Sequence, residues 1–180
     1  MTKGLDEEGD WELLARSADD ASAFGELFRR HRDYVYRVCC GLLGRADAAE
    51  DATHEVFLRV VARHSTLTES ARLRTLLYGF ALNVVREGWR RGAREVSLSE
   101  EHVERLTAPA VTTELRSDLF RLLPSLPERQ REVLVLRLIE GLATREVAEV
   151  LGCSEGTVKT HLHRATRSLR RKLQEDRRRA

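Results

Sequence analysis

The sequence predicts an all-α protein of two small helical domains joined by a linker. Apolar residues recur at spacings of three and four through most of the 180 residues, which is the period of an amphipathic helix. No sustained alternation of apolar and polar residues, bounded by turn residues, favours a sheet. With 42% hydrophobic and 33% charged residues, the chain can bury one substantial core or two small ones, so a globular protein is expected.

The first helical block is expected over residues 10–91. Breaks are predicted near residues 19–20, near 44–45 and in the polar stretch 64–70, where polar residues and glycine interrupt the helical period. Three apolar stripes in this block predict a small helical core; they fall within residues 24–42, 52–61 and 73–84.

A polar stretch without clear periodicity follows the first block and is interpreted as a linker. Beyond it, helical periodicity returns and continues almost to the end of the chain. The predicted organisation is an N-terminal segment (1–19), a first domain (20–92), the linker (93–112), a second domain (113–174) and a basic tail (175–180).

Prolines and glycine mark the helix boundaries at the start of the second domain. Its first helix is expected to end at Leu123, because Pro124 and Pro127 follow and disfavour a continued helix. Pro127 can open the next helix in its first turn, where the missing N–H is not needed. Gly141 is the expected C-terminal cap of that helix.

Two further helices are predicted on either side of a tight turn. Thr144 is a partial start signal for the first of them, with Glu146 one place too early for a capping box. Gly152 tolerates a positive φ at its end, and Ser154 is a good N-cap for a helix that begins at Glu155. The apolar positions of that last helix, spaced for one buried stripe, are Val158, Leu162, Ala165 and Leu169.

The exposed remainder of the last helix is rich in hydrogen-bonding and cationic side chains: Thr157, Lys159, Thr160, His161, His163, Arg164 and Arg167. Two short helices around a glycine turn, with a polar and basic second helix, are typical of a helix-turn-helix. The DNA major groove admits one helix, base edges need short or forked donors, and phosphates need Lys or Arg. The alternative is an amphipathic helical hairpin with a solvated charged face.

The charge is unevenly distributed although the net charge is only +2. The basic C-terminal end suggests an anionic partner. The acidic N-terminal run either docks on a partner or is a frayed, solvated start, and the second interpretation is preferred. The acidic residues concerned are Asp6, Glu7, Glu8, Asp10 and Glu12.

No enzyme active site, metal site or cofactor is expected from the sequence. His161 and His163 point about 200° apart on a helix, so they cannot share one ion. Three cysteines form no disulfide framework, and Cys39 lies on an apolar stripe, where a small core residue is expected. No signal architecture and no apolar run long enough to span a bilayer is found, so a soluble, cytoplasmic protein is expected.

The string LPSLPERQREVLVLRLIEGLATREVAEVLGCSEGTVKTHLHRATRSLRRKL resembles the second conserved domain of extracytoplasmic-function (group four, two-domain) sigma factors of bacterial RNA polymerase. GTVKTHL alone also resembles the DNA-binding domain of LuxR-type regulators. The first block, with FGELFRRHRDYVYRVCCGLLG, AEDATHEVFLRVVARH and LRTLLYGFALNVVREGWRR, resembles the first sigma domain in the expected order and favours the sigma family.

This resemblance implies three sets of site residues. Asp51 and Glu55 match the segment that docks on the clamp helices of the β′ subunit. Asn83 matches the residue that reads the minus-ten element as a separated strand, while loop 64–72 would rim the pocket for a base. The phosphate ligands for that strand would be Arg86, Arg90 and Arg91. The minus-35 duplex would be held by Ser154, Thr157, Lys159, Thr160, His163, Arg164 and Arg167.

The implied partners are core RNA polymerase, through its β′ clamp helices and β flap, promoter DNA and an anti-sigma factor. Trp89 could stack on a base or pack in the core, and core packing is preferred. A stand-alone regulator of LuxR type is the first alternative function, because it would bind duplex DNA without the polymerase. An interaction protein that only mimics a sigma factor is the second.

Overall fold

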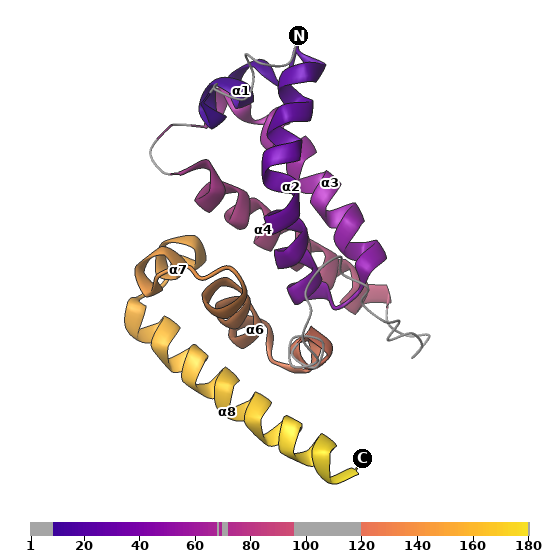
Figure 1. Cartoon of the computed structure of the whole chain (residues 1–180), viewed down its shortest axis with the longest axis vertical. Helices are drawn as coiled ribbons and strands as arrows, with labels where there is room; N and C mark the ends of the chain where they lie inside the picture. Colours follow the sequence, from indigo (N-terminus) through magenta and orange to yellow (C-terminus); the bar gives the residue numbers. More distant parts are fainter. Residues whose placement is uncertain (1–8, 68, 70–71, 96–119, 180) are drawn as a thin grey trace.

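The structure is a computed structural model that describes residues 9–67, 69, 72–95 and 120–179. Within these ranges every regular element is helical, as the sequence period predicted (Figure 1). The acidic residues at positions 6–8 and nearly all of the predicted linker lie outside the described residues. The helices form two groups, which we call the first domain (α1 to α4) and the second domain (η2 to α8).

The first domain has its helix breaks where the sequence predicted them. Asp20 begins α2, because its carboxylate accepts hydrogen bonds from the backbone of Ser22 at 2.8 Å and Ala23 at 3.3 Å. Gly44, with a φ of +72°, ends that helix in the left-handed region. The elements are α1 (Asp10–Arg16), α2 (Ala21–Leu43), α3 (Ala46–Ala62), the 3-10 turn η1 (His64–Thr66) and α4 (Leu73–Glu95), which continues past the predicted boundary at residue 92.

One core joins the helices of the first domain. The fully buried side chains that α2, α3 and α4 contribute include Val35, Val38, Cys39, Val56, Phe57, Leu77 and Ala81, so Cys39 is a core residue, as expected. α1 also packs on α2 and buries Leu13 and Leu14. The preferred interpretation of a frayed, solvated start is therefore wrong for α1.

The described residues of the second domain start with helical residues 120–122, which end one residue before the predicted Leu123. Pro127 directly precedes α6, and Gly141, with a φ of +69°, closes the following segment as predicted. The elements are η2 (Leu123–Ser125), α6 (Glu128–Leu134), the π-helical turn η3 (Val135–Ile139), α7 (Thr144–Leu151) and α8 (Glu155–Arg179), which includes most of the predicted basic tail.

α7 and α8 form the predicted helix pair around Gly152, which has a φ of +64°. Ser154 caps α8, because its hydroxyl accepts a hydrogen bond from Thr157 N at 3.1 Å. The start of α7 differs from the prediction: the N-cap is Ala143, so Glu146 is at N3, and its carboxylate accepts from Ala143 N at 2.7 Å. The stripe of α8 is buried at Val158, Ala165 and Leu169 and half-buried at Leu162.

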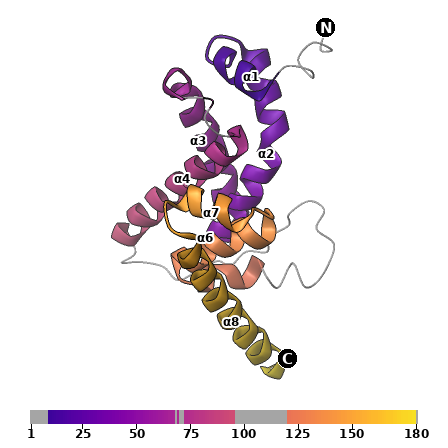
Figure 2. The same ribbon diagram turned by 90° about the vertical axis from the view of Figure 1, so that its left-hand side faces the viewer.

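The two domains pack against each other, with α6 and α7 between α4 and α8 (Figures 1 and 2). α2 lies against η2, α6 and η3, and α4 lies against α7. Glycine permits this approach: a Cβ at Gly41 would lie 2.9 Å from Val135 Cγ2, and one at Gly44 would collide with the ring of Pro124. The sequence predicted the two helical groups but not this contact between them.

Candidate nucleic-acid interface

The outer face of α8 presents all seven residues predicted to hold the minus-35 duplex. Each of them is exposed: Ser154, Thr157, Lys159, Thr160, His163, Arg164 and Arg167. The early residues also support the start of the helix, since the hydroxyls of Ser154 and Thr157 lie 2.9 Å apart. α8 projects from the second domain (Figure 1), and its seven candidate residues are exposed, as a helix that enters a major groove requires.

Cations dominate the middle of this face. Among the described residues, no carboxylate forms an ion pair with Lys159, Arg164 or Arg167. Such cations can release counterions from DNA when they bind phosphates, which gives affinity without sequence preference. The short side chains of Thr157 and Thr160 at the N-terminal end of α8 can approach base edges. His161, which was placed on the exposed face, is half-buried.

α4 carries the residues predicted to hold the separated minus-ten strand. Asn83, Arg90 and Arg91 are all exposed. Positions 83 and 90 are seven apart, so they lie on one side of the helix. An amide offers both donor and acceptor to a base edge, and the two guanidinium groups can hold phosphates. Trp89 is partly buried against the core, in agreement with the preferred interpretation.

Arg86 differs from the other predicted minus-ten residues. It donates two hydrogen bonds to Glu132 of α6, from Nε to Oε1 at 2.6 Å and from Nη2 to Oε2 at 2.8 Å. Glu132 is 1% exposed, and its hydrogen bonds raise the pKa of Arg86. In this structure Arg86 therefore binds a carboxylate of the second domain and is not available to phosphate.

The predicted polymerase-docking residues lie on the outer side of α3. Asp51 is exposed, whereas Glu55 accepts a hydrogen bond from Arg59 at 2.6 Å, and Arg59 also contacts Glu87 at 2.7 Å. Leu58 lies one helical turn further along and is 60% exposed. Leu58 was not among the predicted docking residues, although its position seven residues after Asp51 places it on the same face.

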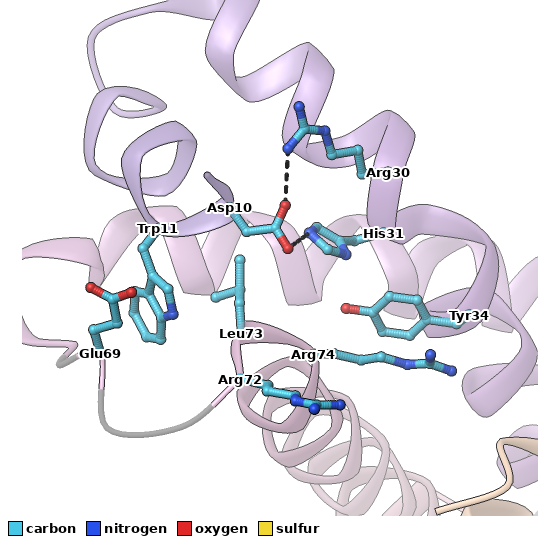
Figure 3. Close-up of a pocket in the computed structure, with 9 residues that line it drawn as sticks. All are labelled: Asp10, Trp11, Arg30, His31, Tyr34, Glu69, Arg72, Leu73 and Arg74. Atoms are coloured by element: carbon cyan, nitrogen blue, oxygen red, sulfur yellow. Dashed lines mark hydrogen bonds and ion pairs between the residues drawn. The ribbon is translucent and has the colours of Figure 1, made fainter. Parts of the chain in front are cut away.

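A cavity of about 680 Å³ lies where α1, α2 and the start of α4 meet (Figure 3). The loop predicted to rim a pocket contributes Glu69 and Arg72 to its lining. The contribution of α1 to this cavity was not predicted, although Asp10 and Trp11 lie in the first turn of an apolar-periodic segment. The lining residues are Asp10, Trp11, Arg30, His31, Tyr34, Glu69, Arg72, Leu73 and Arg74.

His31 is the titratable group buried beside this cavity. Its Nε2 lies 3.1 Å from Asp10 Oδ2, and Arg30 contacts the other oxygen of the same carboxylate at 3.1 Å. Burial lowers the pKa of His31 below its ordinary value, Asp10 opposes this, and Arg30 and Arg74 add to the lowering. His31 is therefore held mainly neutral in the folded chain near pH 7.

We expect acid to destabilise the first domain through His31. Because its folded pKa lies below its unfolded value, the unfolded chain binds more protons between the two, and stability falls as pH drops below about 6.5. In His31→Gln this contribution is absent. Thermal unfolding, followed by circular dichroism at a series of pH values, should show a shallower acid-side fall of the melting temperature in the variant. Equal slopes in the two proteins would contradict the assignment.

Comparison with known proteins assigns both domains to one family. A family model described as Sigma-70 region 2 matches residues 27–95, and one described as Sigma-70, region 4 matches residues 116–169. The ECF RNA polymerase sigma factor EcfG of Rhodopseudomonas palustris is 31% identical over 131 residues, which cover 71% of this chain and 72% of EcfG. The chain belongs to the ECF sigma factors of the sigma-70 family.

Two further relatives bear the same description. The ECF RNA polymerase sigma factor BldN of Streptomyces coelicolor is 36% identical over 174 residues, which cover 92% of this sigma factor. This sigma factor spans just under two thirds of BldN, 66% of its length. SigW of Bacillus subtilis is 29% identical over 171 residues, covering 87% of this chain and 91% of SigW. The LuxR-type alternative is not supported, since region 2 accounts for the first domain.

Solved structures share the fold of this sigma factor. The sigma factor RpoE, in a co-crystal structure with the anti-sigma factor NepR from Bartonella quintana, matches with a TM-score of 0.73 at 23% identity, over 84% of this chain and 96% of RpoE. CnrH, in complex with the cytosolic domain of CnrY, matches with a TM-score of 0.65 at 25% identity, over 94% of this chain and 99% of CnrH. Both similarities agree with the all-α, two-domain architecture.

Two negative findings apply to the described part of the sigma factor. Its helices include none with the length and apolar character needed to cross a membrane. Within the same residues there is no cluster of three or more His, Cys, Asp or Glu side chains that could hold a metal ion.

Proposed function

We propose that this sigma factor binds core RNA polymerase in the cytoplasm and directs it to promoters, with α8 on the minus-35 duplex and α4 on the melted minus-ten strand. The observation that carries the proposal is the pairing, in one chain of the sigma-70 family, of an uncovered cationic α8 face with the exposed Asn83, Arg90 and Arg91 of α4. The first face suits duplex DNA and the second suits a single strand.

Contact with the polymerase is assigned to the outer face of α3 and, through the second domain, to the β flap. Asp51 and Glu55 would pair with basic residues of the β′ clamp helices, which sets the register of docking more than its strength. Leu58, which is 60% exposed, would supply the apolar contact beside them. Leu58 is an exposed leucine that follows two acidic residues on the same side of the helix. Such a position fits a docking face better than a role in folding.

An anti-sigma factor is the proposed regulatory partner. The solved structures of RpoE and CnrH hold those proteins in complexes named for NepR and CnrY. The similarity in fold supports a partner of the same kind for this sigma factor. Such a partner would act by covering surfaces that the polymerase needs.

Transcription in vitro from genomic fragments tests the proposal, with core polymerase alone, with added sigma factor and with the Asn83→Ala variant. Initiation at discrete sites is expected only when the sigma factor is present. Loss of one base-reading contact of about 1–3 kcal/mol predicts about 5- to 150-fold less initiation by Asn83→Ala. Gln174→Ala is the matched control, because it removes an exposed amide at the far end of α8.

The outcomes separate the remaining functions. Discrete initiation, reduced by Asn83→Ala but not by Gln174→Ala, supports both the sigma activity and the role of the amide. If the Asn83→Ala variant initiated transcription as well as the unchanged chain, Asn83 would not be part of the minus-ten site. A chain that binds core polymerase without starting transcription at any fragment would instead be a sigma mimic that sequesters its partner.

A further inference from the structure

The cavity where α1, α2 and the start of α4 meet lies apart from the residues that the proposed function assigns to DNA and to polymerase. Its most buried lining residues are His31 and Tyr34 of α2 and Leu73 of α4. Leu73 precedes Asn83 by ten residues, or about 15 Å along the helix. The volume of about 680 Å³ falls in the range of roughly 300–1,000 Å³ that is usual for sites of small molecules. The cavity is large enough for a ligand of its own.

The hydroxyl of Tyr34 is a buried polar group that has no hydrogen-bond partner among the described residues. Tyr34 is 7% exposed, and its hydroxyl is directed into the cavity (Figure 3). Burial raises the pKa of Tyr34, so the hydroxyl stays protonated and can donate. An unpaired buried hydroxyl costs free energy, and native structures rarely keep one without a reason. Its position indicates an acceptor atom that a ligand brings to the cavity.

Arg72 is the cation that is available at this cavity. Arg30 contacts Asp10 at 3.1 Å and Arg74 contacts Glu140 at 2.9 Å, so these two lining arginines are paired with carboxylates. Within the described residues no carboxylate pairs with Arg72, whose side chain is exposed. A guanidinium fork matches the two oxygens of a carboxylate, and both hydrogen bonds are then charge-assisted. The ligand is therefore expected to carry an oxyanion.

Trp11 and Leu73 give the cavity an apolar side. The indole of Trp11 is partly buried and packs against the core of the first domain, and Leu73 is buried. An indole face favours a planar aromatic ring, because aromatic pairs gain energy beyond their buried area. Glu69 also lines the cavity and would repel an anion. The charge of the ligand is thus expected at Arg72, with its ring on Trp11.

From these observations we propose that the cavity binds a free, soluble aromatic carboxylate. The ring of the ligand lies on Trp11 and Leu73, and its carboxylate accepts hydrogen bonds from Arg72 and from the Tyr34 hydroxyl. Because these residues belong to α1, α2 and the start of α4, the bound molecule connects three elements of the first domain. It stabilises that domain by mass action, since the unfolded chain has no such site.

A nucleotide of the melted strand is the competing occupant, because it also combines a ring with an oxyanion. Each nucleotide inside a strand has a phosphate on either side. The carboxylates of Asp10 and Glu69 line the same cavity, and they would repel these flanking charges. A free ligand with one negative charge, directed at Arg72, meets less repulsion. The lining therefore favours the small carboxylate over the strand.

Isothermal titration calorimetry of the full chain with naphthoate tests the proposal. Arg72→Gln removes the guanidinium, and Tyr34→Phe removes only the hydroxyl. The matched controls are Arg32→Gln and Tyr36→Phe, because Arg32 is exposed and Tyr36 half-buried on α2, and neither lines the cavity. Tyr34→Phe removes no hydrogen bond of the described chain. Its melting temperature without ligand is therefore not expected to fall.

Naphthoate is expected to bind the unchanged chain and both controls alike. Loss of a charge-assisted hydrogen bond weakens binding by about 10- to 150-fold in Arg72→Gln, and loss of a neutral one by about 2- to 10-fold in Tyr34→Phe. Cyclohexanecarboxylate has the same charge without an aromatic ring, so it is expected to bind about 2- to 10-fold more weakly than naphthoate. Naphthoate at about ten times its Kd is expected to raise the melting temperature by about 5–10 °C.

The inference would be overturned if naphthoate did not bind, or if Arg72→Gln and Tyr34→Phe bound it as tightly as their controls. An oligothymidine titration is the second arm. If oligothymidine lost affinity in the two cavity variants while naphthoate did not bind, the cavity would belong to the melted strand and not to a free ligand. Neither arm contains polymerase or a promoter. A failure of this site is therefore distinguishable from a failure of the sigma activity, which the transcription assay measures.

Discussion

Replacing Phe57 with alanine is expected to lower the free energy of unfolding by about 3–5 kcal/mol, the usual loss for a buried aromatic side chain. Phe57 is 1% exposed, and its ring meets the ring of Phe28 edge-on with centroids 4.8 Å apart. The total stability of a domain is only about 5–15 kcal/mol, so the loss removes much of it. Urea unfolding followed by circular dichroism measures the change.

Leu58→Ala is the matched control at the adjacent position. Because Leu58 is 60% exposed, its truncation should change the free energy of unfolding by no more than about 0.5 kcal/mol. If Leu58 docks on the polymerase, losing about 1–2 kcal/mol of apolar burial weakens binding to core polymerase by about 5- to 30-fold. A Leu58→Ala chain that unfolds like Phe57→Ala, or binds polymerase like the unchanged chain, would contradict the docking assignment.

Removing the cations of the α8 face is expected to have the largest effect on promoter binding. The triple variant is Lys159→Ala/Arg164→Ala/Arg167→Ala. Log affinity falls linearly with log salt, and each lost phosphate contact should make this fall shallower by about one unit of slope. At about 1 kcal/mol for each contact, promoter affinity falls on the order of 100-fold. Filter binding of polymerase reconstituted with the variant, over a series of salt concentrations, measures both quantities.

A second triple variant tests whether the position of the lost cations on α8 matters, or only their number. Arg170→Ala/Arg171→Ala/Lys172→Ala removes three cations from the same helix, further from its N-terminal end. These residues are expected to contribute attraction to any DNA, so the preference for promoter over random fragments should survive. If the second variant lost that preference and the first kept it, the assignment would be contradicted, because promoter recognition would then depend on residues further towards the C-terminal end of α8.

Helix boundaries were predictable because their signals are local. The cap at Asp20, the left-handed Gly44 and Gly152 and the cap at Ser154 each act within a few residues of their own position. Exposure along α8 followed from the same helical period, since one buried stripe fixes the opposite face. These features gave the two helical domains and the exposure of the residues that are predicted to hold the minus-35 duplex.

The contact between the domains was not predictable from such signals. Arg37 and Glu140 are 103 residues apart, and Arg86 and Glu132 are 46 apart. A charged residue on an amphipathic helix looks the same in sequence whether it faces water or a partner helix. Arg86 was therefore predicted to bind DNA, although in the structure it binds the carboxylate of Glu132. The contact between Asp10 and His31 was not predicted for the same reason, because Asp10 lies in α1 and its partners Arg30 and His31 lie in α2.

The burial of Cys39 and Cys40 side by side in α2 has a chemical consequence. Burial raises the pKa of the Cys39 thiol to about 12 and also raises that of Cys40, so little thiolate forms near neutral pH. Alkylating reagents and peroxide attack the thiolate, and both sites are closed to them while the first domain is folded. Cys153, half-exposed in the turn before α8, is the accessible thiol of the three. Iodoacetamide is therefore expected to modify the turn between α7 and α8 in the native protein, and modification of the α2 pair would report that the first domain has opened to solvent.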